Sequence, residues 1–216
     1  MKIDLHVHTM ERSPCAHASE DEQIQAAIAA GLDALFITDH WTLVSPARLA
    51  ELNHRYAPFR IFGGIEVTAD GEDLLVLGIR ERILETREWR YPDLHGFVRE
   101  RGGFLILAHP FRYSPAINFD LQACPPDAIE LYTPNTPITA QAEIRAAAQP
   151  LSIPLLSNSD AHTTERLGTH YNILPSSVLD EEVIFSQLRS GKFELFCKNS
   201  LSIRPASSTP PRPRRR

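Results

Sequence analysis

The chain has 216 residues, of which 43% are hydrophobic and 23% charged, and its formal net charge is −5. This length and apolar content predict one globular domain with a sizeable core, and the acidic balance argues against a basic surface for long nucleic acid. No apolar run approaches the roughly 18 to 20 residues of a membrane span, so no membrane-embedded part is expected.

The three cysteines, Cys15, Cys124 and Cys197, are too few and too widely spaced for a disulfide framework. The N-terminus leads directly into a predicted strand and has no pattern of a signal peptide. Together these features favour a cytoplasmic protein. Nothing in the sequence indicates an obligate protein partner.

The C-terminal segment differs from the rest of the chain. Residues 205–216 contain four prolines and four arginines and have no apolar periodicity. We therefore expect a disordered tail after a domain over residues 1–204. A solvated terminus is favoured over a basic arm that binds nucleic acid.

The first predicted strand covers residues 2–8 and alternates between apolar and polar side chains. Its polar face carries Asp4, His6 and His8. Two imidazoles separated by one residue lie on the same side of a strand and can reach the same metal ion. This pair alone is a weak indication of a metal site.

The first half of the chain then alternates between predicted helices and strands. A capping box at Ser19–Glu22 opens a helix that ends near Gly31. The following elements are a buried strand over 33–40, a helix from Ser45, and strands over 60–68 and 74–79 joined by a turn at Asp70-Gly71.

The second half continues the alternation. Strands are predicted over 104–110, 128–132, 154–162 and 193–197, and helices over 92–101, 138–149 and around Val183–Leu188. Repeated strand and helix units indicate a parallel sheet with helices outside it. About seven such strands suit a closed or distorted barrel, similar to a TIM barrel, in a single α/β domain.

Polar residues with metal-binding side chains fall at the C-terminal ends of these strands. In parallel barrels this edge carries the active site, so residues distant in sequence meet there. His17, in the loop after the first strand, can reach the same edge. Each residue alone could be part of a strand face, a turn or a helix cap, but their shared position predicts a centre of two or three ions, with Glu66 as the natural bridge. The predicted ligands are His6, His8, His17, His40, Glu66, His109, Asp160 and His162.

Five short motifs, in this order, resemble the signature of the PHP (polymerase and histidinol phosphatase) superfamily. They are Asp4-x-His6-x-His8-Thr9, Thr38-Asp39-His40, Gly64-Ile-Glu66, Ala108-His109-Pro110 and Ser159-Asp160-Ala161-His162. The resemblance runs from residue 2 to about residue 170. It implies a distorted (β/α)7 barrel, up to three divalent ions of zinc, manganese or iron, and hydrolysis of phosphoesters.

The resemblance also assigns ligands to parts of the cluster. Within the family, the spacing Cys15-x-His17 resembles the histidinol phosphatase branch. The compact length, and Gly102-Gly103 ahead of the His-Pro motif, resemble small phosphoesterases that act on nucleotides and short RNA. His6, His8, Glu66 and Asp160 would form one part, and His17, His40, His109 and His162 the rest.

The chain departs from the family pattern at one place. Where members carry a further histidine, this sequence has Glu72-Asp73. Either Asp73 replaces that histidine as an oxygen ligand or the third ion is weak or missing. His95 is expected at the surface of a helix, and His54 and His170 are given no role.

The expected mechanism is attack on phosphorus by a metal-activated hydroxide. Arg112 is the candidate for binding a phosphate oxygen, and Arg12 is a second one. Either could instead be a surface charge, and for Arg12 that alternative is favoured. Asp39 is a catalytic candidate, and Asp4 and Asp39 suit either orientation of a neighbouring imidazole or proton transfer.

Three functions compete at this point. The first is a phosphoesterase acting on a small phosphomonoester, a nucleotide or a short oligonucleotide. The second is a metal-dependent hydrolase of a non-phosphate bond, because fold and ligand cluster do not determine the substrate. The third is a non-catalytic module stabilised by metal, which the nearly complete ligand set disfavours.

Overall fold

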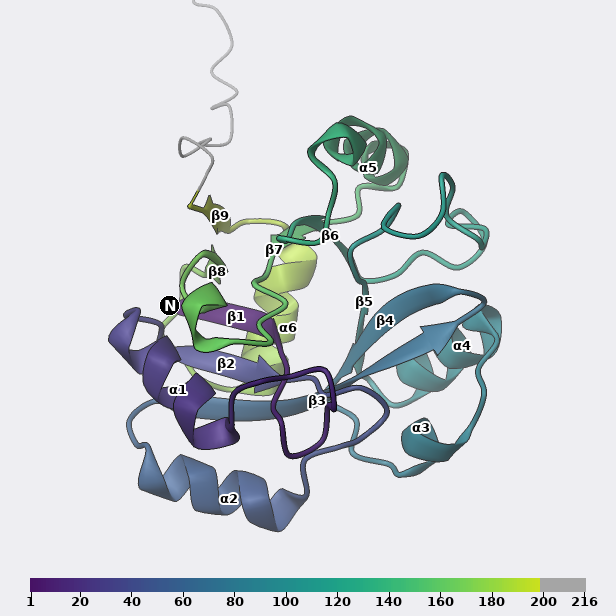
Figure 1. Cartoon of the computed structure of the whole chain (residues 1–216). Helices are drawn as coiled ribbons and strands as arrows, with labels where there is room; N and C mark the ends of the chain where they lie inside the picture. Colours follow the sequence, from purple (N-terminus) through teal and green to yellow (C-terminus); the bar gives the residue numbers. More distant parts are fainter. Residues whose placement is uncertain (199–216) are drawn as a thin grey trace, which may run out of the picture.

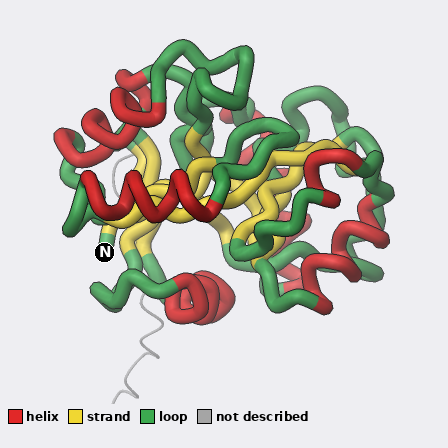
Figure 2. Tube along the Cα trace, turned by 90° about the horizontal axis from the view of Figure 1, so that it is seen from below, coloured by secondary structure: helices red, strands yellow, loops and turns green. Residues whose placement is uncertain are grey.

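The computed structural model describes residues 1–198. All its strands belong to one nine-stranded sheet in the order β7-β6-β5-β4-β3-β2-β1-β8-β9, and the helices lie outside this sheet (Figure 1, Figure 2). The predicted barrel-like α/β fold is confirmed, with nine strands instead of seven. The predicted domain boundary at residue 204 and the tail over 205–216 lie outside the described residues.

The observed elements follow the predicted order, with two additions. The sequence pattern did not predict the short strand β8 or the short helix α3. The strands are β1 Lys2–Val7, β2 Ala34–Ile37, β3 Arg60–Ala69, β4 Glu72–Leu77, β5 Phe104–Leu107, β6 Ala128–Tyr132, β7 Leu155–Ser157, β8 His170–Ile173 and β9 Glu194–Cys197. The helices are α1 Glu20–Ala29, α2 Pro46–Arg55, α3 Ile83–Thr86, α4 Tyr91–Glu100, α5 Gln141–Ala148 and α6 Glu181–Ser190. Over residues 1–198, none of the helices is both long and apolar enough to cross a membrane.

The starts of the first two helices agree with their predicted capping signals. The Ser19 hydroxyl accepts a hydrogen bond from the Glu22 amide, and the Glu22 carboxylate accepts one from the Ser19 amide. At the start of α2 the Ser45 hydroxyl accepts a hydrogen bond from the Arg48 amide, and Pro46 lies in the first turn. These caps satisfy amide groups that have no partner inside the helix, so both helices begin at defined residues.

The sheet contains two parallel blocks separated by one reversed strand. Strands β1, β2 and β3 are parallel, as are β5, β6 and β7, while β4 runs antiparallel to both β3 and β5. The predicted hairpin at Asp70-Gly71 is therefore confirmed. Its register pairs Glu66 with Leu75 and Thr68 with Asp73, so the beginning of β4 lies beside the end of β3.

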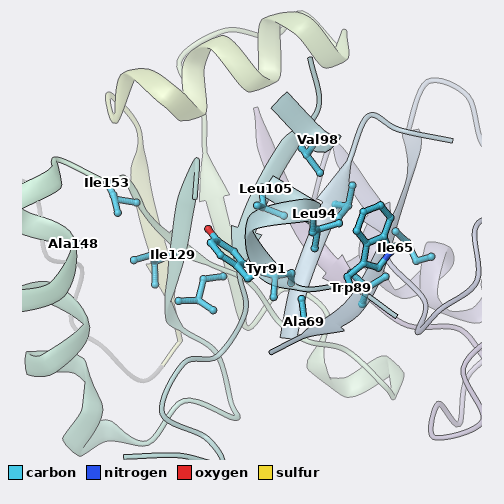
Figure 3. Packing of buried hydrophobic residues seen from close by; sticks show 14 of the residues in the cluster. Ile65, Ala69, Trp89, Tyr91, Leu94, Val98, Leu105, Ile129, Ala148 and Ile153 are labelled. Carbon is cyan, nitrogen blue, oxygen red and sulfur yellow. The ribbon is translucent and has the colours of Figure 1, made fainter. Parts of the chain in front are cut away.

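Three buried apolar clusters hold the helices against the sheet. One lies under α4 and α5, a second under α6, and a third under α1 and α2. In Figure 3, Tyr91, Leu94 and Val98 of α4 lie close to Leu105 of β5 and other residues of the first cluster. Because both faces of the sheet are covered, the backbone that carries the polar residues is fixed by apolar packing on either side.

The carboxyl ends of the parallel strands meet at one edge, whereas β4 and β8 run the other way. Short parallel bridges pair His40 with Glu66 and Val7 with Ala161. The His8 amide also donates to the Ala161 carbonyl at 2.9 Å. These backbone contacts bring the segments after β1, β2 and β7 to the end of β3.

Candidate metal centre

Seven of the eight predicted ligands converge at this edge. They come from β1 and the loop after it, from the ends of β2, β3 and β5, and from the loop after β7. The converging residues are His6, His8, His40, Glu66, His109, Asp160 and His162.

Glu66 is shared by four imidazoles. Its Oε2 lies 3.3 Å from His6 Nε2, 3.1 Å from His8 Nε2 and 3.1 Å from His40 Nδ1. Its Oε1 lies 3.2 Å from His109 Nε2. The carboxylate is almost completely buried, so both its oxygens serve this cluster.

Asp160, in the loop after β7, lies on the other side of the His6 and His8 rings from Glu66. Its Oδ1 lies 3.3 Å from His6 Nε2, 3.2 Å from His8 Nε2 and 3.4 Å from His162 Nδ1. The amide of Asn135 donates to its Oδ2. Carboxylates therefore lie on both sides of the His6 and His8 rings. Their two negative charges would be uncompensated in the middle of the cluster if the imidazoles were neutral.

Four groups of three side chains have ligand atoms close enough to bind one ion. Asp73 is among them, because the β3–β4 hairpin places it beside Glu66 and His109, and this is the residue considered as an oxygen ligand from the sequence. The groups are His8, His40 and His162; His6, His109 and Asp160; His6, His8 and Glu66; and Glu66, Asp73 and His109.

The electrostatics of the cluster favour positive charge at its centre. Burial alone would lower the pKa of His6, but Asp160, Glu130 and Glu66 raise it well above its ordinary value. Burial alone would raise the pKa of Glu66, but His6 and His109 hold it well below its usual range. The pKa of Asp160, which burial alone would raise, is likewise lowered by His6 and His8. Glu66 and Asp160 therefore stay ionised and attract either protons or a cation.

The donor set fits divalent metal ions. Nitrogen and carboxylate oxygen atoms converge without complete hydrogen bonding, because Asp160 Oδ1 is buried and accepts no hydrogen bond. His6 Nε2 and His8 Nε2 lie only 2.9 Å apart. Such crowding of lone-pair donors is typical of side chains that bind zinc, manganese or iron.

Two candidate ligands have unusual backbone conformations. His109 has φ of +25° and Asp160 has φ of +45°, in the region that favours glycine. Residues without a glycine's freedom adopt it only where the surrounding structure enforces it, and such sites are frequent in active sites. Here the strained backbone turns both side chains towards Glu66 and His6.

Arg112 and Asp39, the two predicted catalytic residues, have different surroundings. Arg112 lies at the rim, with its side chain about a third exposed (33%) and Nη1 3.8 Å from Asp160 Oδ2. Asp39 is fully buried and accepts four hydrogen bonds, from the Thr9 amide and hydroxyl, Ser13 Oγ and Arg12 Nε. Its oxygens therefore have no free position facing the cluster.

The prediction that Arg12 is a surface charge was wrong. Its side chain is 12% exposed, with Nη2 2.5 Å from Glu20 Oε1 and Nε 2.8 Å from Asp39 Oδ2. Arg48 Nε lies 2.7 Å from the second Glu20 oxygen. These ion pairs connect α2, α1, the first loop and the end of β2, so Arg12 holds the loop that carries Ser13.

Asp4 contacts the backbone of the cluster and none of its rings. It is fully buried and accepts hydrogen bonds from the amides of His6 at 3.3 Å and Ser159 at 3.1 Å. Burial raises the pKa of Asp4 to about 7. The side chain thus positions the backbone on either side of the centre.

His17 stays a prediction. Its amide donates to the His162 carbonyl at 2.8 Å, which places the residue at the correct edge. Its side chain is exposed, however, and among the described residues it belongs to none of the four groups. Within residues 1–198, His54, His95 and His170 also lie outside these groups. His95, expected at the surface, is half-buried, and its Nε2 lies 3.1 Å from the Pro125 carbonyl oxygen.

Sequence reasoning missed several residues that hold the ligands in place. The main one is Glu130, which is fully buried in β6 with Oε1 3.0 Å from His6 Nδ1. Ser13 is another: its hydroxyl donates to Asp39 and lies 3.3 Å from His8 Nδ1. An acidic residue inside the apolar strand Ala-Ile-Glu-Leu-Tyr was a usable signal for Glu130, whereas Ser13 lies in a polar loop with no such contrast.

Comparisons with known proteins agree with this geometry. Residues 139–193 match the family described as PHP-associated. No curated protein matches the sequence.

Among solved structures, a two-domain protein from Bacteroides vulgatus ATCC 8482 containing a predicted PHP-like metal-dependent phosphoesterase aligns with a TM-score of 0.70 and 16% identity over 91% of this chain. The chain spans 64% of that protein. An amidohydrolase from Chromobacterium violaceum, with bound sulfate, aligns with a TM-score of 0.63 and 18% identity, and the alignment covers 78% of this chain and 90% of that one. The lesion-specific endonuclease PfuEndoQ from Pyrococcus furiosus aligns with a TM-score of 0.62 and 17% identity, and the alignment covers 90% of this chain and 57% of that one. These likenesses establish a shared fold.

Proposed function

We propose that the chain is a metal-dependent hydrolase of phosphoesters of the PHP type, on the basis of its fold and of the match of residues 139–193 to the PHP-associated family. The observation that carries the proposal is the convergence of five imidazoles on two buried carboxylates, Glu66 and Asp160, with Arg112 at the rim. Fixed positive charge beside a metal-binding cluster is suited to a phosphoryl group.

The proposed ligand set is the predicted one, extended by Asp73. Two or three divalent ions of zinc, manganese or iron would share Glu66 as the bridge. His8, His40 and His162 would hold one ion, and Asp73 with His109 and Glu66 would hold an additional one. His17 joins the set only if its exposed ring turns towards His162.

The mechanism divides between the ions and the protein. When bound, the ions supply Lewis acidity, which lowers the pKa of water and neutralises phosphoryl charge. Arg112 binds and orients phosphate oxygens through its guanidinium fork. Asp39 acts as a positioning residue, because it holds Ser13 and through it the His8 ring.

We propose a small phosphomonoester, a nucleotide or a short oligonucleotide as substrate. The similar fold of the endonuclease PfuEndoQ supports an oligonucleotide, and the acidic charge of this chain speaks against long nucleic acid. The unpaired cysteines support a reducing, cytoplasmic location. The exposed His17 ring weakens the alternative of a histidinol-phosphatase-like enzyme.

A second candidate is hydrolysis of a non-phosphate bond, which the similar fold of the amidohydrolase from Chromobacterium violaceum supports. The experiment that separates the two compares Arg112→Ala with wild type in the presence of manganese, on p-nitrophenyl phosphate, nucleoside monophosphates and a carboxylic amide. A phosphoesterase should lose about 10- to 100-fold in kcat/KM on the phosphoesters, since one charge-assisted interaction is worth roughly 1.5–3 kcal/mol.

The matched control is Arg82→Ala, whose side chain is 88% exposed on the protein surface. It should leave kcat/KM unchanged. Cleavage of the amide alone, or equal phosphoester activity of Arg112→Ala and wild type, would contradict the proposal.

A further inference from the structure

We infer that Glu130, Asn158 and Asn172 form a buried hydrogen-bond chain that closes the barrel and determines which nitrogen of His6 faces the metal centre. All three side chains are fully buried. The inference rests on the proposed function in one respect, because it assigns the orientation of a proposed ligand.

The chain begins where the two ends of the sheet meet. Strands β7 and β9 are the terminal strands of the sheet order. Side chains join them: the Ser157 hydroxyl donates to the Phe196 carbonyl at 2.6 Å. Asn172 of β8 accepts from the Ser157 amide at 3.0 Å and donates to the Ser157 carbonyl at 2.9 Å. The barrel is thus closed by side chains of buried polar residues.

Asn172 then fixes the direction of Asn158. The Asn172 Nδ2 donates to Asn158 Oδ1 at 2.9 Å, and the Leu5 amide donates to the same oxygen at 3.3 Å. With its oxygen facing two donors, Asn158 must turn its Nδ2 the other way. That nitrogen donates to Glu130 Oε1 at 2.7 Å.

Glu130 is the acceptor at the end of this chain. Its Oε1 also lies 3.0 Å from His6 Nδ1, and its Oε2 accepts from the His109 amide at 2.9 Å. Because both Glu130 oxygens already accept from N–H donors, of the Asn158 side chain and the His109 backbone, Glu130 is the acceptor of this network and His6 Nδ1 carries the hydrogen. The other ring nitrogen, Nε2, is the atom that lies beside His8, Glu66 and Asp160.

This arrangement assigns Glu130 as a positioning residue with two effects. It selects the His6 tautomer that offers Nε2 as a ligand, as carboxylates behind metal-binding histidines do in general. It also holds the backbone of His109, a second proposed ligand. The sheet closure and the orientation of two ligands therefore depend on the same three side chains.

A double variant separates positioning from stability. In Glu130→Gln with Asn158→Asp, the new carboxylate at 158 can accept from the new amide nitrogen at 130, and the amide oxygen can accept from His109. Net charge and hydrogen-bond count are kept. The amide nitrogen now faces His6 Nδ1, however, so His6 must accept there and carry its hydrogen on Nε2.

The single variant Glu130→Gln has the opposite defect. Its amide oxygen can still accept from His6 and Asn158, but its amide nitrogen then faces the His109 amide, so two buried donors point at each other and neither has an acceptor. We expect the single variant to melt several degrees below wild type and the double variant to melt close to it. Zinc affinity should show the reverse order, with the double variant weakened most, by about 10- to 100-fold.

The measurements are calorimetric titration of chelator-treated protein with zinc alone and thermal melts without metal. Glu143→Gln, an exposed residue of α5, removes the same charge at the surface and should change neither. Equal zinc affinity in the double variant and wild type overturns the inference, as does an affinity that simply follows melting temperature across the variants.

Failure of the proposed function has a different signature. If wild type binds zinc and the variants show the expected order of zinc affinities, the inferred orientation of His6 is supported. If wild type then cleaves no phosphoester, only the proposed hydrolase function is refuted. If the double variant does not fold, Asn172→Ala compared with Glu130→Gln provides the second test. At similar losses of melting temperature, zinc affinity should fall more in Asn172→Ala, where Asn158 loses the donor that orients it, than in Glu130→Gln, and equal zinc affinity in the two would overturn the inference.

Discussion

Single residues at this site serve several partners at once. Glu66 contacts four imidazoles through two oxygens, and Asp160 contacts three through one. The sequence could predict such residues because they follow strands whose ends share an edge. Glu130 is noticeable in the sequence as an acidic residue inside an apolar strand, but its partners and those of Asn158 could not be predicted, since these contacts join residues 124 and 28 positions apart along the chain.

His170 shows how a residue outside the site responds to its burial. It is 8% exposed, and its Nε2 lies 3.2 Å from Cys197 Sγ. Burial and the nearby Arg166 lower the pKa of His170 to about 4, against 6.5 for an exposed ring. Between these values the unfolded chain binds the extra proton.

The contribution of His170 to the free energy of unfolding should therefore be fully present above pH 6.5 and be lost as the pH falls towards 4. For one proton the slope reaches about 1.4 kcal/mol per pH unit. In urea denaturation, the free energy of unfolding of His170→Gln should fall less steeply between pH 7 and pH 4.5 than that of wild type. His54→Gln, an exposed position of α2, should keep the wild-type slope, and an identical slope for His170→Gln would refute this assignment.

At the scale of elements, the hairpin of β3 and β4 is the part that sets the centre most directly. It carries Glu66 and Asp73 on adjacent strands. Gly64 permits the close packing: a Cβ there would lie 2.6 Å from Leu77 Cδ2 and 3.0 Å from the Val76 carbonyl oxygen. The backbone oxygen cannot move away without disturbing the strand pairing.

Gly64→Ala should therefore destabilise the protein by about 1–3 kcal/mol and weaken zinc binding through displacement of Glu66. Gly96→Ala is the matched control, because a Cβ at this position of α4 meets nothing within 4 Å. It should stabilise the helix by about 0.5–1 kcal/mol. Thermal melts and zinc titration check both, and a neutral Gly64→Ala would show that the hairpin is looser than its packing indicates.

The elements that sequence patterns predicted are those with strong periodicity or capping. Ser19, Ser45 and the Asp70-Gly71 turn marked boundaries that the structure confirms. Strand β8 was missed because His-Tyr-Asn-Ile is short and half polar. Its polar side chains are buried only through tertiary contacts, such as Asn172 with Ser157, and these have no local signature.

At the scale of the whole molecule, the metal centre joins charged side chains from distant segments of the chain. Metal binding should therefore stabilise the folded state as a whole. Ions that bind only the folded state add stability of about 2.7 kcal/mol at 100 times Kd. For a chain of this size that corresponds to roughly 5–10 °C in melting temperature. Zinc added to chelator-treated protein should produce this rise in scanning calorimetry.

Glu66→Gln provides the control for that experiment, because it removes the charge shared by four imidazoles. Its melting temperature should rise less with zinc than that of wild type, because two of the four ligand groups contain Glu66. A wild-type melting temperature that is independent of zinc concentration would argue against any metal centre in the folded protein.

The bridge between Val7 and Ala161 has a consequence for biosynthesis. A nascent chain presents His6 and His8 to the cell long before Asp160 has been translated. Until then the N-terminal imidazoles lack the carboxylate that completes the cluster, and β1 lacks its neighbour β8. The proposed centre can therefore be completed only after Asp160 has been translated, when seven of the nine described strands have already been made.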